Sequence, residues 1–217
     1  MADPGPPAPS YPQEPVRRLM FALTLLVLLA GAAGCGDGSA PAGDASQLRS
    51  RFEGAKLSHP RQTGDFALRD QHGELIRLSA LRGKVLLVTF LYTNCPDVCP
   101  LIAENLNSSL RALGAERVDV RVLAVSVDPT GDTAAAVRAY SRRHRLLPEF
   151  HYLVGTRQEL EPVWKEYGVT AVARNPELVD HSAYTLVVDR DGRGRVVFDA
   201  AARPREIAHD VRLLLAS

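Results

Sequence analysis

The stretch VLLVTFLYTNCPDVCP, residues 85–100, contains the two features that decide the fold. Its first part, residues 85–90, is a near-continuous apolar run, which is the pattern of a strand buried on both faces. Cys95 and Cys99 follow it four positions apart, so that on a helix or its first turn both sulfurs point to the same side. We therefore expect a central strand that leads into a helix, with a thiol pair at the junction.

Outward from this stretch, strand patterns alternate with helix patterns. A small hairpin is expected over residues 65–78, and apolar residues at helical spacing follow the cysteines. The expected elements after them are a strand at 118–127, a helix at 132–144 with Asp132 as its cap, a strand at 152–154, a helix at 157–167, a strand pair within 184–199 and a closing helix at 204–215. This order predicts an α/β domain with a thioredoxin-like fold, an N-terminal β-hairpin extension and an inserted helix.

Composition limits the classes of function that the chain can have. The 217 residues are 46% hydrophobic, which is enough for one ordinary domain with a core. Lys and Arg total 26 against 25 Asp and Glu, so the sequence carries no excess charge that would indicate nucleic acid as a partner. Only three cysteines occur, which are too few for a scaffold held together by disulfides.

The N-terminal region has the pattern of an export signal. Arg17 and Arg18 precede an apolar stretch at 19–33, which is about as long as the core of a signal peptide and short for a membrane-spanning helix. Gly34 and Cys35 then end it as in a bacterial lipoprotein signal, in which the cysteine is lipidated. We expect an extension and signal over 1–35, a flexible tether over 36–62 and the folded domain over 63–217.

The Cys95 and Cys99 pair is compatible with a redox couple, a metal site or a structural disulfide. A helix N-terminus favours the thiolate, which both binds metals and attacks disulfides. Three residues separate the cysteines, whereas a thioredoxin-type reductase normally has two. Soft thiolates select Cu(I), although zinc accepts them too, and a structural zinc site would need a second ligand pair that this chain lacks. The spacing therefore favours a metal site and leaves redox chemistry open.

A third ligand is needed for such a site, and His181 is the best placed of six histidines. It stands just before the expected strand at 184, where thioredoxin-like folds bring a loop beside the first helix. No proline lies between Glu177 and Phe198, so the cis-proline that presents substrate in thioredoxins is missing. Asp180 is the nearest candidate to orient the His181 ring. Asp97 is a candidate to tune the site electrostatically or to contact a partner. Solvent-exposed loop and turn roles are equally compatible with both carboxylates.

Three segments together resemble the Sco (SenC) family of copper-binding proteins, which help to assemble cytochrome c oxidase. They are YTNCPDVCP at 92–100, AVSVDP at 124–129 and DHSAYTLVVD at 180–189, and the resemblance covers roughly residues 63–215. It implies a thioredoxin-like fold. It also implies that Cys95, Cys99 and His181 bind Cu(I) and Cu(II).

The resemblance further implies where the protein works and with what. It implies an exported protein on the periplasmic side of the bacterial cytoplasmic membrane, held there by a lipid on Cys35 or by an N-terminal anchor. The implied partners are the CuA site of cytochrome c oxidase subunit II and other copper chaperones.

Some members of the family act mainly as thiol–disulfide reductases, and this alternative stays open. In it, Cys95 attacks a disulfide of the oxidase subunit and Cys99 resolves the mixed disulfide. His181 would then be replaceable. A peroxiredoxin-like peroxidase is disfavoured because position 92, where it needs threonine, is tyrosine.

Overall fold

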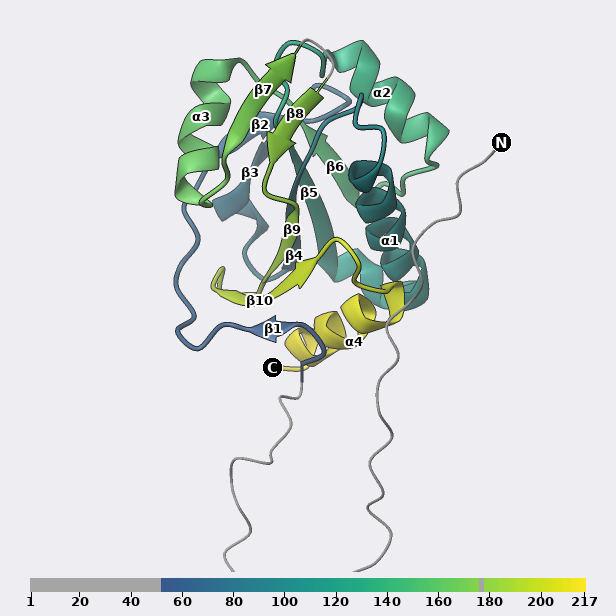
Figure 1. The fold of residues 1–217 in the computed structure, drawn as a ribbon. Helices are drawn as coiled ribbons and strands as arrows, with labels where there is room; N and C mark the ends of the chain where they lie inside the picture. The colour runs from purple at the N-terminus through teal and green to yellow at the C-terminus, as the bar shows by residue number, and fades with distance from the viewer. Residues whose placement is uncertain (1–51, 176–177) are drawn as a thin grey trace, which may run out of the picture. The chain divides into compact units, whose positions relative to one another are not determined.

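A six-stranded mixed sheet forms the centre of the domain (Figure 1). The computed structural model describes residues 52–175 and 178–217. The strands lie in the order β1 (Ala55–Lys56), β10 (Gly194–Asp199), β9 (Tyr184–Val188), β4 (Val85–Leu91), β5 (Val120–Ser126) and β6 (Phe150–Leu153). The last three strands run parallel, and β9, β10 and β1 each pair antiparallel with their neighbours.

Helices cover both faces of this sheet, as the apolar runs require. Figure 1 shows α1 (Val98–Leu113), α2 (Ala134–Arg143) and α4 (Pro204–Leu215) on one face, and α3 (Arg157–Glu166) with the hairpin of β2 (Ala67–Arg69) and β3 (Leu75–Arg77) on the other. All seven residues of β4 are buried, which confirms the expected central strand. Two short 3₁₀ helices, Leu78–Leu81 and Gly114–Asp119, precede β4 and β5. The expected alternation of strands and helices is confirmed.

The inserted helix α3 is fixed to the end of the sheet where the cysteines lie. The indole Nε1 of Trp164 donates a hydrogen bond of 2.9 Å to the carbonyl oxygen of Ser126, the last residue of β5. The ring of Tyr167, just after α3, contacts the rings of Phe66 and Phe90 with centroids 6.0 and 5.7 Å away. These contacts tie α3 to the β2–β3 hairpin and to β4.

The turn of the β2–β3 hairpin closes the open edge of β6. The side-chain amide of Gln71 donates to the carbonyl oxygen of Phe150 at 2.9 Å and accepts from the backbone N–H of Tyr152 at 2.7 Å. It therefore takes the place of a neighbouring strand. Beside it, Asp70 and His151 lie 3.0 Å apart. An edge that would otherwise expose unpaired backbone groups is covered in this way.

A second hairpin stands where the sequence indicated a loop. Strands β7 (Ala171–Asn175) and β8 (Leu178–His181) pair antiparallel with each other and form a sheet of their own. The expectation of a loop before the strand at 184 is therefore wrong. Alanine, arginine and asparagine in β7 give a weak strand signal, and only tertiary context makes this segment extended.

The expected tether, 36–62, is wrong at its C-terminal end. Strand β1 pairs with β10, and Gln62 forms a bridge with Arg193. The carboxylate of Asp210 in α4 accepts from the backbone N–H groups of Glu53 and Gly54 at 2.8 and 3.0 Å. The chain is thus attached to the sheet from about residue 53. Strand β1 has only two residues, so the sequence shows no strand pattern there.

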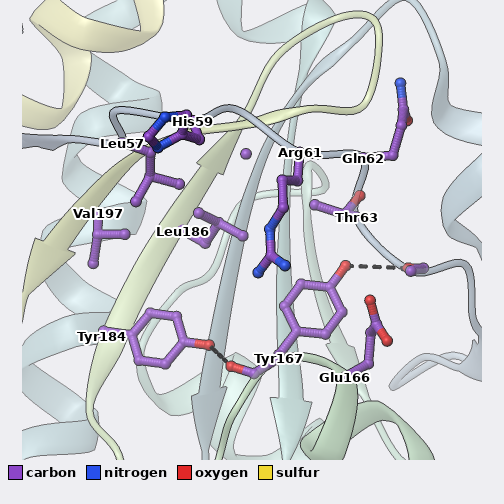
Figure 2. A pocket seen from close by; sticks show the side chains of 12 residues that line it. Leu57, His59, Arg61, Gln62, Thr63, Glu166, Tyr167, Tyr184, Leu186 and Val197 are labelled. Atoms are coloured by element: carbon purple, nitrogen blue, oxygen red, sulfur yellow. Dashed lines mark hydrogen bonds between the residues drawn. The ribbon is translucent and has the colours of Figure 1, made fainter.

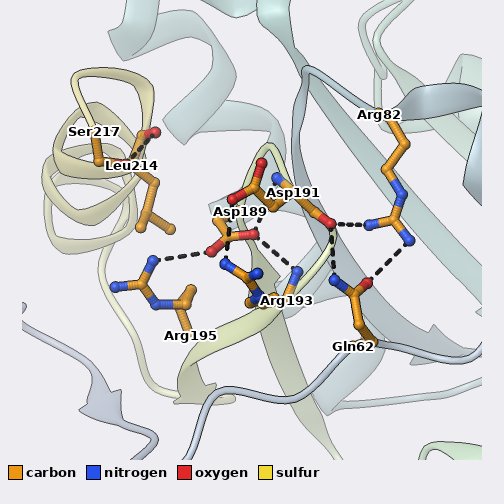
Figure 3. Close-up of polar contacts among 8 residues, drawn as sticks. All are labelled: Gln62, Arg82, Asp189, Asp191, Arg193, Arg195, Leu214 and Ser217. Atoms are coloured by element: carbon orange, nitrogen blue, oxygen red, sulfur yellow. Dashed lines mark hydrogen bonds and ion pairs between the residues drawn. The ribbon is translucent and has the colours of Figure 1, made fainter.

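Polar contacts at the β9–β10 turn secure this attachment (Figure 3). Asp189 accepts from the backbone N–H groups of Asp191 and Arg193 at 3.1 and 2.8 Å. The Asp191 carbonyl oxygen accepts from the side chains of Arg82 and Gln62. Gln62 is therefore tied to the turn by its side chain as well as by its backbone.

The predicted signal and most of the predicted tether, including Cys35, lie outside the described residues. Within the described ranges, no helix is both long and apolar enough to span a membrane.

Candidate metal centre

The thiol pair lies where β4 passes into α1. Cys95 is in the turn between them, and its backbone N–H donates to the carbonyl oxygen of Tyr92 at 3.3 Å. Cys99 is the second residue of α1, and its backbone N–H donates to the sulfur of Cys95 at 3.3 Å. Cys99 is fully buried, whereas 8% of Cys95 remains exposed, and both are free thiols. Solvent and partners therefore reach the pair through Cys95.

The two thiols differ strongly in acidity. The hydrogen bond from the Cys99 side chain lowers the pKa of Cys95 to about 5 against the opposing effect of burial, with help from the backbone N–H groups of Asp97 and Cys99 and from Tyr92. Because Cys99 donates to Cys95 and is buried, its own pKa is raised. At neutral pH the pair is one thiolate and one thiol that share a proton. The N-terminus of α1 favours the negative charge there.

Tyr92 connects the thiol pair to the β7–β8 hairpin. It is almost completely buried, and burial, together with the two cysteines, raises the pKa of its hydroxyl to about 12 even though a hydrogen bond to the backbone of Val179 opposes the shift. Val179 belongs to β8 and lies two residues before His181. The end of β4 is therefore linked to the strand that carries the third expected ligand.

The structure brings together two of the three expected ligands, Cys95 and Cys99. Of the third, His181, it describes only the backbone. His181 is the last residue of β8 and pairs with Ala171. The side chains of His181 and Asp180 lie outside the described part of the structure. Among the side chains that are described, no three Cys, His, Asp or Glu groups gather into a metal site. The described backbone contains no cis peptide bond.

Asp97 occupies the N-cap position of α1 but does not act as a cap. Its side chain makes no capping hydrogen bond, and the residue is exposed. Its backbone N–H helps to hold the Cys95 thiolate. The carboxylate of Asp97 thus stands at the surface beside Cys95, the more accessible thiol of the pair.

Asp132 is a site residue that sequence reasoning misplaced. It was expected to cap the helix, but the N-cap of α2 is Thr133, whose Oγ1 accepts from the backbone N–H of Ala136 at 3.2 Å. Asp132 is instead buried behind the thiol pair, and its negative charge contributes to the raised pKa of Cys99. The pKa of Asp132 itself is raised, chiefly by burial.

Four hydrogen bonds hold the Asp132 carboxylate. It accepts from the backbone N–H and Oγ1 of Thr93 at 2.8 and 2.7 Å, from Oγ of Ser126 at 2.6 Å and from the hydroxyl of Tyr152 at 3.4 Å. It therefore joins the loop after β4 to the end of β5 and to β6. One signal could have revealed it, because an acidic residue shortly after a parallel central strand lies at the same sheet edge as the residues that follow β4.

A separate hollow of about 500 Å³ lies between the N-terminal segment, β9, β10 and the end of α3 (Figure 2). Tyr184 and Tyr167 face it, and the Tyr184 hydroxyl donates to the carbonyl oxygen of Tyr167. None of its described lining residues is a cysteine. The soft ligands are elsewhere, so we assign the candidate metal centre to the thiol pair.

Comparison with known proteins identifies the family. The SCO1/SenC family model matches residues 54–216. The chain belongs to the SCO1/SenC family. Copper-bound ScoI of Bradyrhizobium japonicum is 34% identical with a TM-score of 0.65, and the match covers 71% of this chain and 100% of that one. Apo Sco1 of Thermus thermophilus is 33% identical with a TM-score of 0.66 and coverages of 76% and 97%.

A third structure adds a redox observation among the relatives. BsSco, a member of the Sco family of cytochrome c oxidase assembly proteins in which a disulfide switch has been identified, is 26% identical. Its TM-score is 0.62, with coverages of 74% and 98%. The Sco structures confirm the expected thioredoxin-like fold for this chain.

The acidity of Cys95 in this SCO1/SenC protein predicts an unusual alkylation profile. The rate of reaction with iodoacetamide should rise through an inflection near pH 5, because the thiolate is the nucleophile and the pKa of Cys95 is about 5. Cys99 should stay unmodified in the folded protein. Peptide mapping by mass spectrometry measures each cysteine separately. Tyr92→Phe removes one hydrogen bond to Cys95 and should move the inflection upward, whereas an inflection near about 8.5 in the wild type would contradict the assignment.

Proposed function

We propose that this protein is an exported, membrane-tethered copper chaperone that binds Cu(I) and Cu(II) through Cys95, Cys99 and His181. Its role is to assist assembly of the CuA site in cytochrome c oxidase. The observation that carries the proposal is the buried thiolate and thiol pair, which Tyr92 connects to the strand ending in His181. Copper-bound ScoI of B. japonicum and the oxidase assembly family of BsSco support it.

The donor set suits the proposed cargo. Two sulfurs on one side of a helix start offer the soft ligands that Cu(I) prefers. Because Cys95 is already a thiolate at neutral pH, only Cys99 has to lose a proton when the metal binds. His181 would complete a three-coordinate site. Copper would then leave by ligand exchange, as a thiolate of the partner enters on the side where Cys95 is exposed.

The proposed location rests on the N-terminal sequence. A lipid on Cys35, or an N-terminal anchor, would hold the domain at the periplasmic side of the cytoplasmic membrane, where subunit II and other copper chaperones would meet it. The intact mass of the mature protein tests the lipid anchor. A chain that begins at Cys35 and carries a diacylglyceryl group supports it, and a chain that begins elsewhere rejects it.

One observation favours a second function, reduction of the disulfide in the oxidase subunit. Cys95 is a low-pKa thiolate that remains 8% exposed, and Cys99 is a fully buried thiol directly beside it. The thiolate of Cys95 would attack the disulfide and release one client thiolate. Cys99 would then attack the mixed disulfide, release the second client thiolate and leave the pair oxidised. Such a reaction needs no histidine.

A Cu(I) titration of the reduced protein against a competing chelator separates the two functions. We expect tight one-to-one binding that weakens at least about tenfold, or about 1.4 kcal/mol, in His181→Ala. The Cys95–Cys99 disulfide should still form in this variant. His72→Ala, a change of an exposed histidine in the β2–β3 turn, is the matched control and should bind like the wild type. Weak binding that His181→Ala leaves unchanged would reject the chaperone in favour of the reductase.

A further inference from the structure

Four arginines that pair with no carboxylate of the described residues stand together on α2 and in the loop that follows it. Arg138, Arg142, Arg143 and Arg145 are all exposed. None of the ion pairs among the described residues involves them, whereas other exposed arginines such as Arg157 are paired with carboxylates. We call these four residues the arginine surface. Its positive charge is available to an anion from outside the domain.

The arginine surface borders a hollow of about 460 Å³. Three of the arginines line it above an apolar floor, and no carboxylate occurs among its described lining residues. Its lining is Gln71, His72, Arg138, Ser141, Arg142, Arg145, Leu146, Leu147 and Pro148. This combination fits a carboxylate side chain together with its aliphatic stem or an apolar neighbour.

A second, more polar hollow of about 620 Å³ lies between α1 and the same loop. Arg111, Arg143 and Arg145 line it, and Glu104 is the one carboxylate among its described lining residues. That carboxylate is already engaged, because its Oε1 lies 3.2 Å from Nδ1 of His144. Three arginines against one carboxylate still leave an excess of positive charge in this hollow.

Arg145 lies between the two hollows and is held there by its backbone. Its φ of 50° is in the left-handed region, which residues other than glycine rarely adopt. The carbonyl oxygen of Arg145 accepts from Nδ2 of Asn107 and from the guanidinium of Arg111, both at 3.0 Å. These two α1 side chains fix the loop. The backbone that carries Arg145 is thus fixed before any ligand arrives.

The arginine surface is connected to the region of the thiol pair through α1 and α2. Tyr140, on the buried side of α2, lies in the electrostatic range of both cysteines, since its pKa is raised by burial and then by their charges. The ring of His144, one turn further on, packs on Tyr140 with centroids 4.2 Å apart. Along α1, Glu104 follows Cys99 by five residues, about 7.5 Å of helix. A protein interface of standard size, about 800 Å² on each partner, can cover both regions.

We propose that the arginine surface docks an acidic surface of the protein that exchanges copper or thiols with Cys95. The inference rests on the proposed function, because such a partner must in any case approach the exposed side of Cys95. The hollow lined by Arg138, Arg142 and Arg145, with its leucine and proline residues, suits protein side chains better than a flat lipid surface. Opposite charge would speed the encounter and set the orientation in which the partner's thiolates meet the site.

The test compares two quadruple variants of the full chain. In one, Arg138, Arg142, Arg143 and Arg145 are changed to glutamine. In the control, four exposed basic residues that form no ion pair in the described structure are changed to glutamine, namely Lys56, Arg61, Lys165 and Arg205. Both remove the same charge. Binding of labelled poly-L-glutamate is followed by fluorescence anisotropy at low and high salt, and vesicles of phosphatidylglycerol and phosphatidylcholine serve as the lipid probe.

We expect poly-L-glutamate to bind the wild type at low salt and to bind the arginine variant at least about tenfold more weakly, with the control close to wild type. Equal weakening in both variants would show an effect of net charge alone and overturn the proposal. Binding to the anionic vesicles without binding to poly-L-glutamate would also overturn it. Cu(I) affinity is measured separately in each variant and should not change, so failure of the docking surface is distinguishable from failure of the copper site.

Discussion

Replacement of both Cys95 and Cys99 by serine is expected to abolish stoichiometric Cu(I) binding. The double variant loses both soft ligands, and a serine hydroxyl is neither soft nor ionised at neutral pH. His181 alone offers one neutral nitrogen, which cannot hold Cu(I) against a chelator. The measurement is the Cu(I) titration of the reduced protein with a competing chelator.

A Cys35→Ser variant is the matched control for the double variant. It replaces the remaining cysteine, which lies outside the described domain and would carry the proposed lipid, and it should bind copper like the wild type. The fold of the double variant is checked by circular dichroism, because Cys99 is buried against the core. Stoichiometric Cu(I) binding by a folded double variant would remove the basis of the proposed function.

The sequence was sufficient for the elements whose signals are local. The apolar run of β4 and the helical spacing of α1 are properties of consecutive residues, and both elements formed close to where they were expected. Strand β1 is different, because its pairing with β10 joins residues that are far apart in the chain. A two-residue strand shows no hydrophobic periodicity. Neither β1 nor the attachment of the N-terminal segment to the sheet from about residue 53 could therefore be predicted.

The same distinction applies to the site. The spacing of Cys95 and Cys99 places both sulfurs together by local geometry alone, and in the structure the two side chains are hydrogen-bonded to each other. Tyr92 and Asp132 take part through contacts with Val179 and Thr93, which depend on how the strands and the β7–β8 hairpin are arranged. The sequence pattern suggested a helix cap for Asp132. Only the packing of the strand ends shows that it lies behind the thiols.

Asp132→Ala is expected to lower the free energy of unfolding by about 3 to 5 kcal/mol. Several buried donors lose their acceptor, and each loss costs about 1 to 3 kcal/mol. The total is smaller than the sum because the hydroxyl donors can partly find other partners. The donors are the backbone and side chain of Thr93, the hydroxyl of Ser126 and the hydroxyl of Tyr152. Urea unfolding at neutral pH measures the change. The matched control is Asp128→Ala, which removes only acceptors for turn N–H groups of Thr130 and Gly131 and should cost less.

The pH dependence of the Asp132 variant provides a second readout. The pKa of Asp132 is raised in the folded protein, so the folded state binds this proton more tightly than the unfolded state. Its contribution to stability is therefore complete below the ordinary value of 3.8 and is lost as pH rises through the raised folded value. Asp132→Asn cannot titrate, so the stability difference between wild type and this variant should change across that window. A stability difference that stays constant with pH would contradict the raised pKa of Asp132. Equal losses of unfolding free energy in Asp132→Ala and Asp128→Ala would contradict the role of Asp132 as the junction behind the thiol pair.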